Sequence, residues 1–466
     1  MVLAKGKNSL AEKPREKFSS RLGFILISAG CAIGIGNVWR FPYVTGNSGG
    51  AIFVLFYIMF LVIMGLPILT MEYSVGRASR LSIAKGYKKL EKPGQKWHLH
   101  AIIGIAANYL LMMYYTIVTG WMLDYFYKMM TGKFVGADTA AVEGIFNDML
   151  GSPGELTFWM LLVVAIGFGI CSLGLQKGVE KITKWMMIAL IGIIMLLAVN
   201  SVLLPGGVEG LKFYLVPNLD TVKEVGLGNV LVAAMNQSFF TLSIGIGAMQ
   251  IFGSYMDRKR TLLGETLIVE SLDTFVALFS GLIIFPACFA FGVEPDSGPN
   301  LIFITLPNVF NAMAGGRIWG SLFFIFMTFA ALSTIIAVFE NIISFAMDGL
   351  NWSRKKATIV NIVLVAALSM PCVLGFNLWS GFEPLRSGNS IMDLEDFLVS
   401  NIMLPLGSII YILFCTSRYG WGWDKFIKEA NMGDGPKFPK KLRFYCAYIL
   451  PLFAAAILIY GLITYF

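Results

Sequence analysis

The sequence predicts an all-α, polytopic membrane protein of about eleven transmembrane helices. Of its 466 residues, 57% are hydrophobic and 14% are charged, whereas charged residues make up roughly a quarter of a soluble domain. The mean hydropathy is +0.72. Apolar stretches of about 20 residues, long enough to cross ~30 Å of hydrocarbon, recur between short polar loops. These observations exclude a single water-soluble core and indicate one membrane domain.

The apolar stretches define the expected spans in chain order. They cover residues 22–45, 49–76, 99–127, 156–175, 182–204, 228–255, 266–292, 317–347, 358–376, 391–416 and 444–466. Two longer segments between spans, 128–155 and 293–316, contain Gly, Pro and amphipathic patches. We expect them to fold over an entrance on the outer side, the second as a re-entrant or capping loop.

The N-terminal segment, residues 1–20, is expected to be cytoplasmic. It is basic and contains no apolar stretch typical of a cleavable signal peptide. The six cysteines fall within or at the ends of apolar stretches, so we expect no disulfide framework.

The basic residues separate by loop. Of the 36 Lys and Arg residues, 29 lie on the side of the N-terminus and 7 on the other side. The clusters are 77–96, 177–184, 258–260, 354–356 and 418–443. By the positive-inside rule, these loops are cytoplasmic and the C-terminus lies outside. The net charge of +8 therefore reflects topology, and no nucleic-acid partner is expected.

Two spans carry glycine where a membrane helix should be continuous. The first contains Ile33-Gly34-Ile35-Gly36 followed by Asn37, and the sixth contains Ile244-Gly245-Ile246-Gly247 after Thr241 and Ser243. An isolated Gly pair is more often a close helix contact. Repetition five spans apart favours paired helix breaks, because unwound backbone in hydrocarbon persists only where it lines a cavity and binds something.

Residues 21–42 resemble the signature first helix of the neurotransmitter:sodium symporter family. The resemblance continues through nearly the whole chain, at Gly65-Leu66-Pro67, Glu72, Gly76-Arg77, Tyr114-Tyr115, 237–243, Ile304-Thr305-Leu306-Pro307 and Ser353-Arg354-Lys355. It is closest to the bacterial amino-acid transporter branch, which has the leucine-transporter fold. The resemblance implies two inverted five-helix repeats with unwound helices 1 and 6, a prokaryotic plasma-membrane location, and Na⁺ and a small amino acid as cargo. No oligomeric state follows from it.

The implied organisation is a single transporter domain over 21–466. The first repeat covers about 21–204, the second about 228–417, and an extra helix covers about 444–466. The twelfth span of animal members is absent. Span five has no proline, where several bacterial relatives have a Gly and Pro that unwind the helix, so its inward-opening route departs from the family pattern.

Two all-oxygen sodium sites are implied by matching motif positions. The first would use Ala32, Asn37, Thr241, Asp273 and the substrate carboxylate. The second would use carbonyls of Gly30, Ile33 and Ala330 with the hydroxyls of Ser333 and Thr334. Carbonyl, hydroxyl and carboxylate oxygens suit a hard cation such as Na⁺. For Ser333 and Thr334, bonding to carbonyls of their own helix is the commoner alternative.

The implied substrate site binds both ends of an α-amino acid. The amides of Ile35 and Gly36 and the Tyr115 hydroxyl would bind the carboxylate. Ala32, Phe240, Thr241 and Ser243 would surround the ammonium group. The side-chain pocket would comprise Leu111, Phe240, Ser243, Ile246, Thr334 and Val338, which suggests a hydrophobic side chain. Gly34 favours an amino acid, because monoamine carriers of the family have an aspartate there.

Four carboxylates lie inside apolar spans, where an unpaired charge costs ~2.5 kcal/mol or more. Glu72 and Glu340 are expected to join structural hydrogen-bond networks, and Glu270 to be a helix-surface charge near the inner end. Chloride-dependent relatives have Asn in place of Asp273. We therefore expect chloride independence, with Asp273 binding Na⁺ or compensating its charge.

Two gates are implied on either side of the site. The outer gate would pair Arg40 with Asp396, above a lid of Tyr115 and Phe240. The inner gate would use Arg15, Phe18, Ser254, Tyr255 and Asp348, with Phe18 in place of the usual tryptophan.

Three alternatives remain open. A membrane-embedded enzyme would need catalytic constellations that the sequence does not contain, and His98 and His100 are expected in a solvated inner loop. A proton-coupled transporter would use Glu72, Glu340 or Asp273 as its proton carrier. A sensor of the same fold would bind substrate without moving it.

Overall fold

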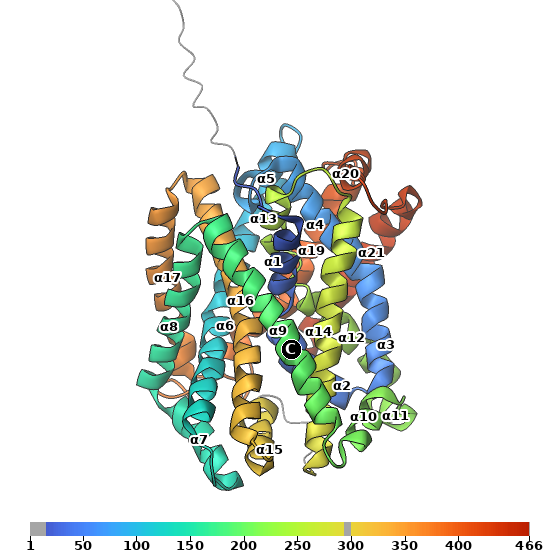
Figure 1. The fold of residues 1–466 in the computed structure, drawn as a ribbon. Helices are drawn as coiled ribbons and strands as arrows, with labels where there is room; N and C mark the ends of the chain where they lie inside the picture. Colours follow the sequence, from blue (N-terminus) through green and yellow to red (C-terminus); the bar gives the residue numbers. More distant parts are fainter. Residues whose placement is uncertain (1–14, 293–299, 466) are drawn as a thin grey trace, which may run out of the picture.

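The computed structural model describes residues 15–292 and 300–465 and is all-α over these ranges. It contains no β-strand there, only two isolated bridges, Gly50 with Pro217 and Arg260 with Asp434. The predicted segment 1–20 and the capping loop 293–316 lie partly outside the described residues. The helices form an upright bundle with one predicted cytoplasmic end and one predicted outer end (Figure 1).

Nine helical runs of the described chain are long and apolar enough to cross a membrane. They are α3 (Ala51–Phe60) with η2 (Leu61–Gly65) and α4 (Leu66–Ser79), α6 (His100–Thr131), α8 (Pro153–Ser172), η4 (Leu175–Glu180) with α9 (Lys181–Val202), α14 (Leu262–Ala290), α16 (Gly316–Leu350), α17 (Arg354–Gly375), α18 (Ile391–Phe397) with η6 (Leu398–Met403) and α19 (Leu404–Thr416), and η8 (Tyr445–Ile449) with α21 (Leu450–Tyr465).

The first and sixth predicted spans are broken. In the first, α1 (Arg21–Ala32) is bent by 56° from η1 (Gly36–Arg40) and α2 (Phe41–Asn47). In the sixth, α12 (Leu227–Thr241) and α13 (Ala248–Tyr255) are separated by residues 242–247. With the bent first pair counted as one span, the described chain has ten helices long and apolar enough to cross a membrane. The broken sixth span would be the eleventh that the sequence predicts. The prediction of a polytopic all-α protein is confirmed.

The second break depends on glycine. Ser243, Gly245 and Gly247 have φ values of 50°, 97° and 82°, in the left-handed region that glycine adopts at little cost. A Cβ on Gly245 would lie 2.4 Å from the carbonyl oxygen of Leu404. The tenth span therefore packs directly on this unwound backbone, and only glycine permits the approach.

Short helices close both ends of the bundle. The end predicted to be cytoplasmic carries α5 (Ile83–Leu90) and α20 (Trp423–Ala430) (Figure 1). The other end carries α7 (Thr139–Gly151), α10 (Gly207–Leu215), α11 (Leu219–Val225) and α15 (Leu306–Ala312). The α20 helix is fixed to α4 by the buried ion pair between Arg77 and Glu429, with an N···O distance of 2.8 Å.

The expectation of a solvated histidine loop is wrong for His100. His98 pairs with Glu91, with 2.7 Å between Nδ1 and Oε1. His100, in contrast, begins α6 and is buried between the rings of Tyr87 and Tyr411. The short helix α5 carries Tyr87 and folds back against the predicted cytoplasmic end of the bundle, where it covers His100. The sequence pattern did not indicate this cover.

Candidate functional site

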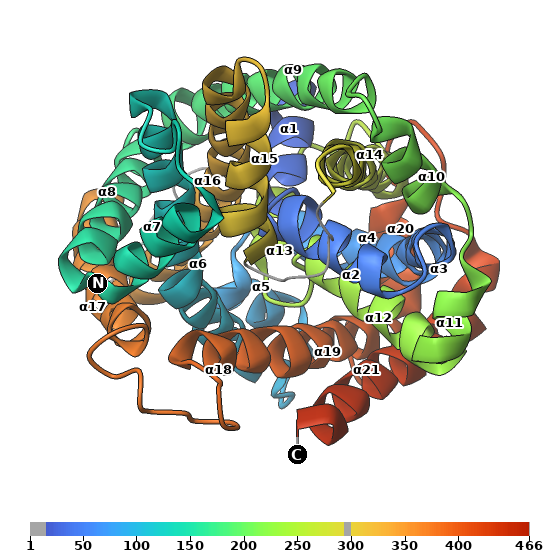
Figure 2. The same cartoon turned by 90° about the horizontal axis from the view of Figure 1, so that it is seen from below.

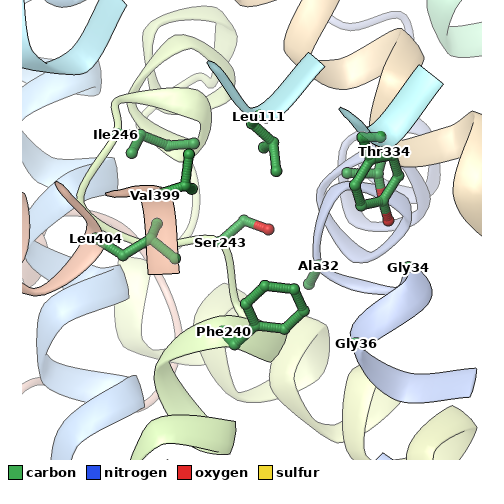
Figure 3. A pocket seen from close by; sticks show the side chains of 11 residues that line it. Ala32, Gly34, Gly36, Leu111, Phe240, Ser243, Ile246, Thr334, Val399 and Leu404 are labelled. Carbon is green, nitrogen blue, oxygen red and sulfur yellow. The ribbon is translucent and has the colours of Figure 1, made fainter. Parts of the chain in front are cut away.

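The two helix breaks face each other across a small central cavity. The space that the centre of a water molecule can occupy in this cavity is only about 20 Å³. The described conformation is therefore closed around the cavity. The cavity is lined by Ala32, Gly34, Gly36, Leu111, Tyr115, Phe240, Ser243, Ile246, Thr334, Val399 and Leu404 (Figure 3). These residues come from the first, third, sixth, eighth and tenth spans, so the site lies where five helices converge.

Asp273 joins the two breaks at one side of the cavity. Its Oδ1 accepts a hydrogen bond from Asn37 Nδ2 at 2.8 Å, and its Oδ2 accepts one from Thr241 Oγ1 at 3.0 Å. Tyr57 Oη lies 3.4 Å from Oδ2. Asn37, Thr241 and Asp273 were predicted, with Ala32, as ligands of one cation. The structure brings the Asn37 amide nitrogen and the Thr241 hydroxyl onto the Asp273 carboxylate in a fully buried cluster.

A second oxygen cluster lies between α1 and α16. Ser333 Oγ donates to the Gly30 carbonyl at 2.9 Å and lies 2.8 Å from the carbonyl of Ala330 in its own helix. Thr334 Oγ1 lies 3.2 Å from the carbonyls of both Gly30 and Ile33. Bonding within the helix therefore accounts for only one of these contacts. The five residues predicted for the second cation converge at the end of α1, where helix geometry leaves carbonyls without amide partners.

Two backbone amides at the first break are bound by side chains. The N–H of Ile35 donates to Tyr115 Oη at 2.9 Å, and the N–H of Gly34 donates to Asn37 Oδ1 at 3.0 Å. A Cβ on Gly34 would lie 2.2 Å from Tyr115 Oη. Gly34 is therefore required for the tyrosine hydroxyl to reach the unwound backbone.

The cavity wall differs in part from the predicted pocket. Leu111, Phe240, Ser243, Ile246 and Thr334 line it as expected, together with Ala32, Gly36 and Tyr115. Ile35, Thr241 and Val338 are buried nearby but do not line it. Val399 and Leu404 of the tenth span were missed, because apolar residues on an apolar helix carry no distinguishing signal.

Glu72 stabilises the break in the sixth span. Its carboxylate accepts hydrogen bonds from the backbone N–H groups of Gly245, Met249 and Gln250, at 2.9, 3.1 and 3.3 Å. Gly245 lies in the unwound stretch, and Met249 and Gln250 lie in the first turn of α13, where amides have no acceptor within the helix. The structural role predicted for Glu72 thus takes a specific form: a buried carboxylate caps a half-helix inside the membrane.

The predicted outer ion pair is not formed among the described residues. The guanidinium carbon of Arg40 lies 4.5 Å from the ring centroid of Phe240, within the range of a cation–π contact. Asp396 instead accepts hydrogen bonds from Tyr114 Oη at 3.0 Å and Ser400 Oγ at 2.7 Å. The outer side is covered by this Arg40–Phe240 contact and by Trp39 against Phe303.

The inner side is closed by the residues predicted for it. Arg15 Nη1 lies 2.7 Å from Asp348 Oδ1, and Arg15 Nε donates to Ser254 Oγ at 3.3 Å. The Arg15 guanidinium also covers the ring of Tyr255, against which Phe18 packs edge-on. Burial alone would lower the pKa of Arg15, but the neighbouring Tyr255 and Asp348 raise it above its ordinary value, so the gate cation stays charged.

Two other carboxylates differ in their surroundings. Glu340 is paired with Arg354, with 2.7 Å between Oε2 and Nη1, and accepts a hydrogen bond from Tyr255 Oη at 2.7 Å. Glu270 is not the surface charge that we expected. It is 5% exposed, and neither carboxyl oxygen has a hydrogen-bond partner in the described part of the chain. It faces the second span, where a Cβ on Gly65 would lie 3.0 Å from its Oε1.

This combination defines the class of protein: a membrane transporter in which two interrupted helices enclose an oxygen-rich site between an inner and an outer closure. Comparison of the sequence with models of known protein families identifies the family. A model of the sodium:neurotransmitter symporter family matches residues 15–141 and 138–466. The chain belongs to this family and is a sodium-dependent symporter.

Individual relatives are similar over nearly their full length. A sodium-dependent transporter of Bacillus subtilis, YhdH, is 32% identical, with 95% of each chain covered. A sodium-dependent transporter of Haemophilus influenzae is 31% identical over 97% of this chain and 99% of its own. Among solved structures, MhsT in complex with L-phenylalanine superimposes with a TM-score of 0.86 at 35% identity, covering 96% of this chain and all of the other.

Proposed function

We propose that this protein is a Na⁺-coupled symporter that imports a small hydrophobic α-amino acid into a prokaryotic cell, independently of chloride. The observation that carries the proposal is the meeting of Ile35 N–H with Tyr115 Oη at 2.9 Å. In the closed site these two groups bond to each other, and an amide and a phenol this close together can instead both donate to one carboxylate. The MhsT complex with L-phenylalanine supports the same class of substrate.

The pocket chemistry supports an amino acid over an amine. A monoamine would need a carboxylate at position 34, but a side chain there would collide with Tyr115 Oη. The remaining wall of Leu111, Phe240, Ile246, Val399 and Leu404 is apolar. Such a wall suits an aliphatic or aromatic side chain and leaves a charged one without a partner.

The two oxygen clusters support sodium as the coupling ion. Asp273, Asn37 and Thr241 supply carboxylate, amide and hydroxyl oxygens beside the carboxylate-binding point, so the substrate can complete the first cation site. Gly30, Ile33, Ala330, Ser333 and Thr334 supply carbonyls and hydroxyls only. Na⁺ binding at either cluster would replace hydrogen bonds that hold the two halves of the site together, which couples ion and substrate binding.

Asp273 also supports chloride independence. It is the carboxylate that contacts the first cluster, so a fixed negative charge balances the cation without an added anion. Each gate is made of contacts that can form and break, as alternating access between two repeats, about 21–204 and 228–417, requires. The N-terminal segment and the basic loops would face the cytoplasm, and the C-terminus the outside.

A screen of uptake in proteoliposomes tests the proposal. Each of the twenty L-amino acids is offered to the full chain under a Na⁺ gradient, a pH gradient or neither, with chloride or gluconate outside. Sodium-driven, chloride-indifferent accumulation of a hydrophobic amino acid is expected. Accumulation driven by the pH gradient alone would identify a proton-coupled transporter. Equilibrium binding without accumulation would identify a sensor.

A further inference from the structure

We propose that a groove on the outer surface of α9, near its cytoplasmic end, binds an anionic phospholipid of the inner leaflet. The α9 helix lies at the rim of the bundle (Figure 2) and crosses α16 obliquely (Figure 1). Their crossing leaves a groove of about 470 Å³. It is lined at one end by Lys177 and Lys181 and along its length by Ile182, Trp185, Ala189 and Phe329.

The positive charges at the basic end of the groove are not paired with acidic side chains in the described part of the chain. Lys177 and Lys181 are exposed, and neither has an ion-pair or hydrogen-bond partner in the ranges 15–292 and 300–465. Glu180, the acid between them, points inward, where its oxygens accept four hydrogen bonds from Ser19 and Ser20. Glu16, the next acid, accepts a hydrogen bond from the Leu175 N–H and pairs with Arg354. The two ammonium groups therefore remain available for an external anion.

The arrangement along the groove matches the order of groups in a phospholipid. Lys177 and Lys181 are four residues apart, so they share a face at the level where the span begins. Trp185, 63% exposed, lies one turn further in, at the depth where aromatic residues contact headgroups and glycerol. Ala189 lies about 12 Å beyond Lys181 at the helical rise, beside Phe329. A phosphate at the lysines would thus place an acyl chain along the apolar part.

The charge of the groove selects among lipids. Lysine clusters on the cytoplasmic side of membrane spans attract anionic headgroups, whereas a zwitterionic headgroup brings no net charge to offset them. A free phosphate would fill only the basic end and leave the apolar length uncovered. The occupant that uses both parts is a diacyl phospholipid with a net negative charge.

A lipid bound in the groove would affect the rate of the transport cycle. This inference rests on the proposed function. The inward face of α9 packs on the first span at Gly30, where an added Cβ would lie 3.2 Å from both Met187 Sδ and Thr183 Cγ2. The carbonyl of Gly30 belongs to the second oxygen cluster. A lipid that restrains α9 would therefore slow opening of that cluster toward the cytoplasm.

Native mass spectrometry of the purified full chain tests the site, with phosphatidylglycerol and phosphatidylethanolamine of identical acyl chains as probes. We expect one tightly bound phosphatidylglycerol with at least tenfold preference over phosphatidylethanolamine. The Lys177→Gln/Lys181→Gln variant should lose this preference. Ala189→Trp, which fills the apolar part without changing charge, should weaken binding of both lipids. The control Lys440→Gln/Lys441→Gln removes another exposed pair on the predicted cytoplasmic end and should change the preference less than twofold.

Two results would overturn the site: an unchanged preference in the groove variant, or an equal loss in the control, which would mean general electrostatic attraction. Uptake in liposomes with and without phosphatidylglycerol tests the coupling separately. Lipid-sensitive uptake by the wild type and lipid-insensitive uptake by the groove variant are expected. Selective binding with lipid-insensitive wild-type uptake would refute the coupling alone. Absence of any amino-acid uptake would refute the proposed function and leave the binding result standing.

Discussion

Glu72 Oε2 accepts a hydrogen bond at 2.9 Å from the backbone N–H of Gly245, so a carboxylate of the second span caps the broken sixth span. Its other oxygen accepts from the N–H groups of Met249 and Gln250. A half-helix that starts inside a membrane has amides with no water to bind. Glu72 supplies the acceptors that an aqueous solvent would otherwise provide.

Glu72→Leu should therefore destabilise the protein strongly. Each buried N–H left without an acceptor costs about 1–3 kcal/mol, and three lose their partner. Glu72→Gln keeps one oxygen acceptor and should have an intermediate effect. Thermal unfolding in detergent measures both, with the exposed Glu209→Gln as a control of unchanged stability. If Glu72→Leu unfolds at the wild-type temperature, the cap is not needed.

Gly34→Ala should abolish high-affinity substrate binding. The added Cβ would lie 2.2 Å from Tyr115 Oη and 2.7 Å from Thr334 Oγ1, so the tyrosine must leave the carboxylate-binding point. We expect a loss of at least tenfold in affinity, equivalent to about 1.4 kcal/mol. The matched control is Gly192→Ala in α9, where a Cβ meets nothing within 4 Å. Wild-type affinity in Gly34→Ala would show that the substrate does not bind at the first break.

Ser333→Ala and Thr334→Val should weaken sodium binding. Both hydroxyls contact the Gly30 carbonyl across the helix interface, and each would be an oxygen ligand. Loss of a hydrogen-bonding group beside a charge costs ~1.5 kcal/mol or more, which is roughly tenfold in affinity. The sodium concentration for half-maximal substrate binding reports the change.

The control for these hydroxyls is Thr328→Val in the same helix. Thr328 is buried, and its hydroxyl donates to the Phe324 carbonyl one turn earlier at 2.7 Å. It therefore tests loss of a hydroxyl that bonds only within its own helix. Equal effects at positions 328, 333 and 334 would mean that Ser333 and Thr334 are also structural.

Arg15→Ala and Asp348→Asn should open the inner side. Their ion pair is largely buried, with side-chain exposures of 17% and 9%, and it joins the chain before α1 to the end of α16. Hydrogen exchange of the backbone amides in α1 and α13 should speed up in both variants, and net uptake should fall. Lys212→Ala breaks the exposed pair with Glu209 on the other end and should leave exchange unchanged. Unaltered exchange in the Arg15 and Asp348 variants would show that the pair is not a gate.

Part of this structure could be predicted because certain residue types stand out in a membrane-spanning sequence. Hydrophobic length predicted the long membrane helices, of which the described chain has nine or, with the bent first pair, ten. The repeated Ile-Gly-Ile-Gly pattern predicted breaks at the two places where helices are interrupted. Polar residues inside apolar spans, such as Asn37 and Asp273, pointed to the oxygen cluster. Each of these signals reflects a cost that a membrane imposes on backbone or charge.

The remainder depends on packing between helices, which leaves no such signal. Val399 and Leu404 line the cavity, yet nothing distinguishes them from lipid-facing leucines and valines. The burial of Glu270 and His100 follows from how their helices rotate against neighbours and how α5 folds back. Arg40 contacts Phe240 and not Asp396, a choice between two partners that sequence position does not decide.

The most direct test of the account is sodium-driven uptake by Asp273→Asn, measured with and without chloride against the wild type. Asp273 joins Asn37 and Thr241 across the two breaks and is proposed to balance the charge of the bound cation. The variant keeps the shape and removes the charge. The account predicts that uptake is lost or becomes dependent on chloride. Wild-type uptake that remains indifferent to chloride would contradict it.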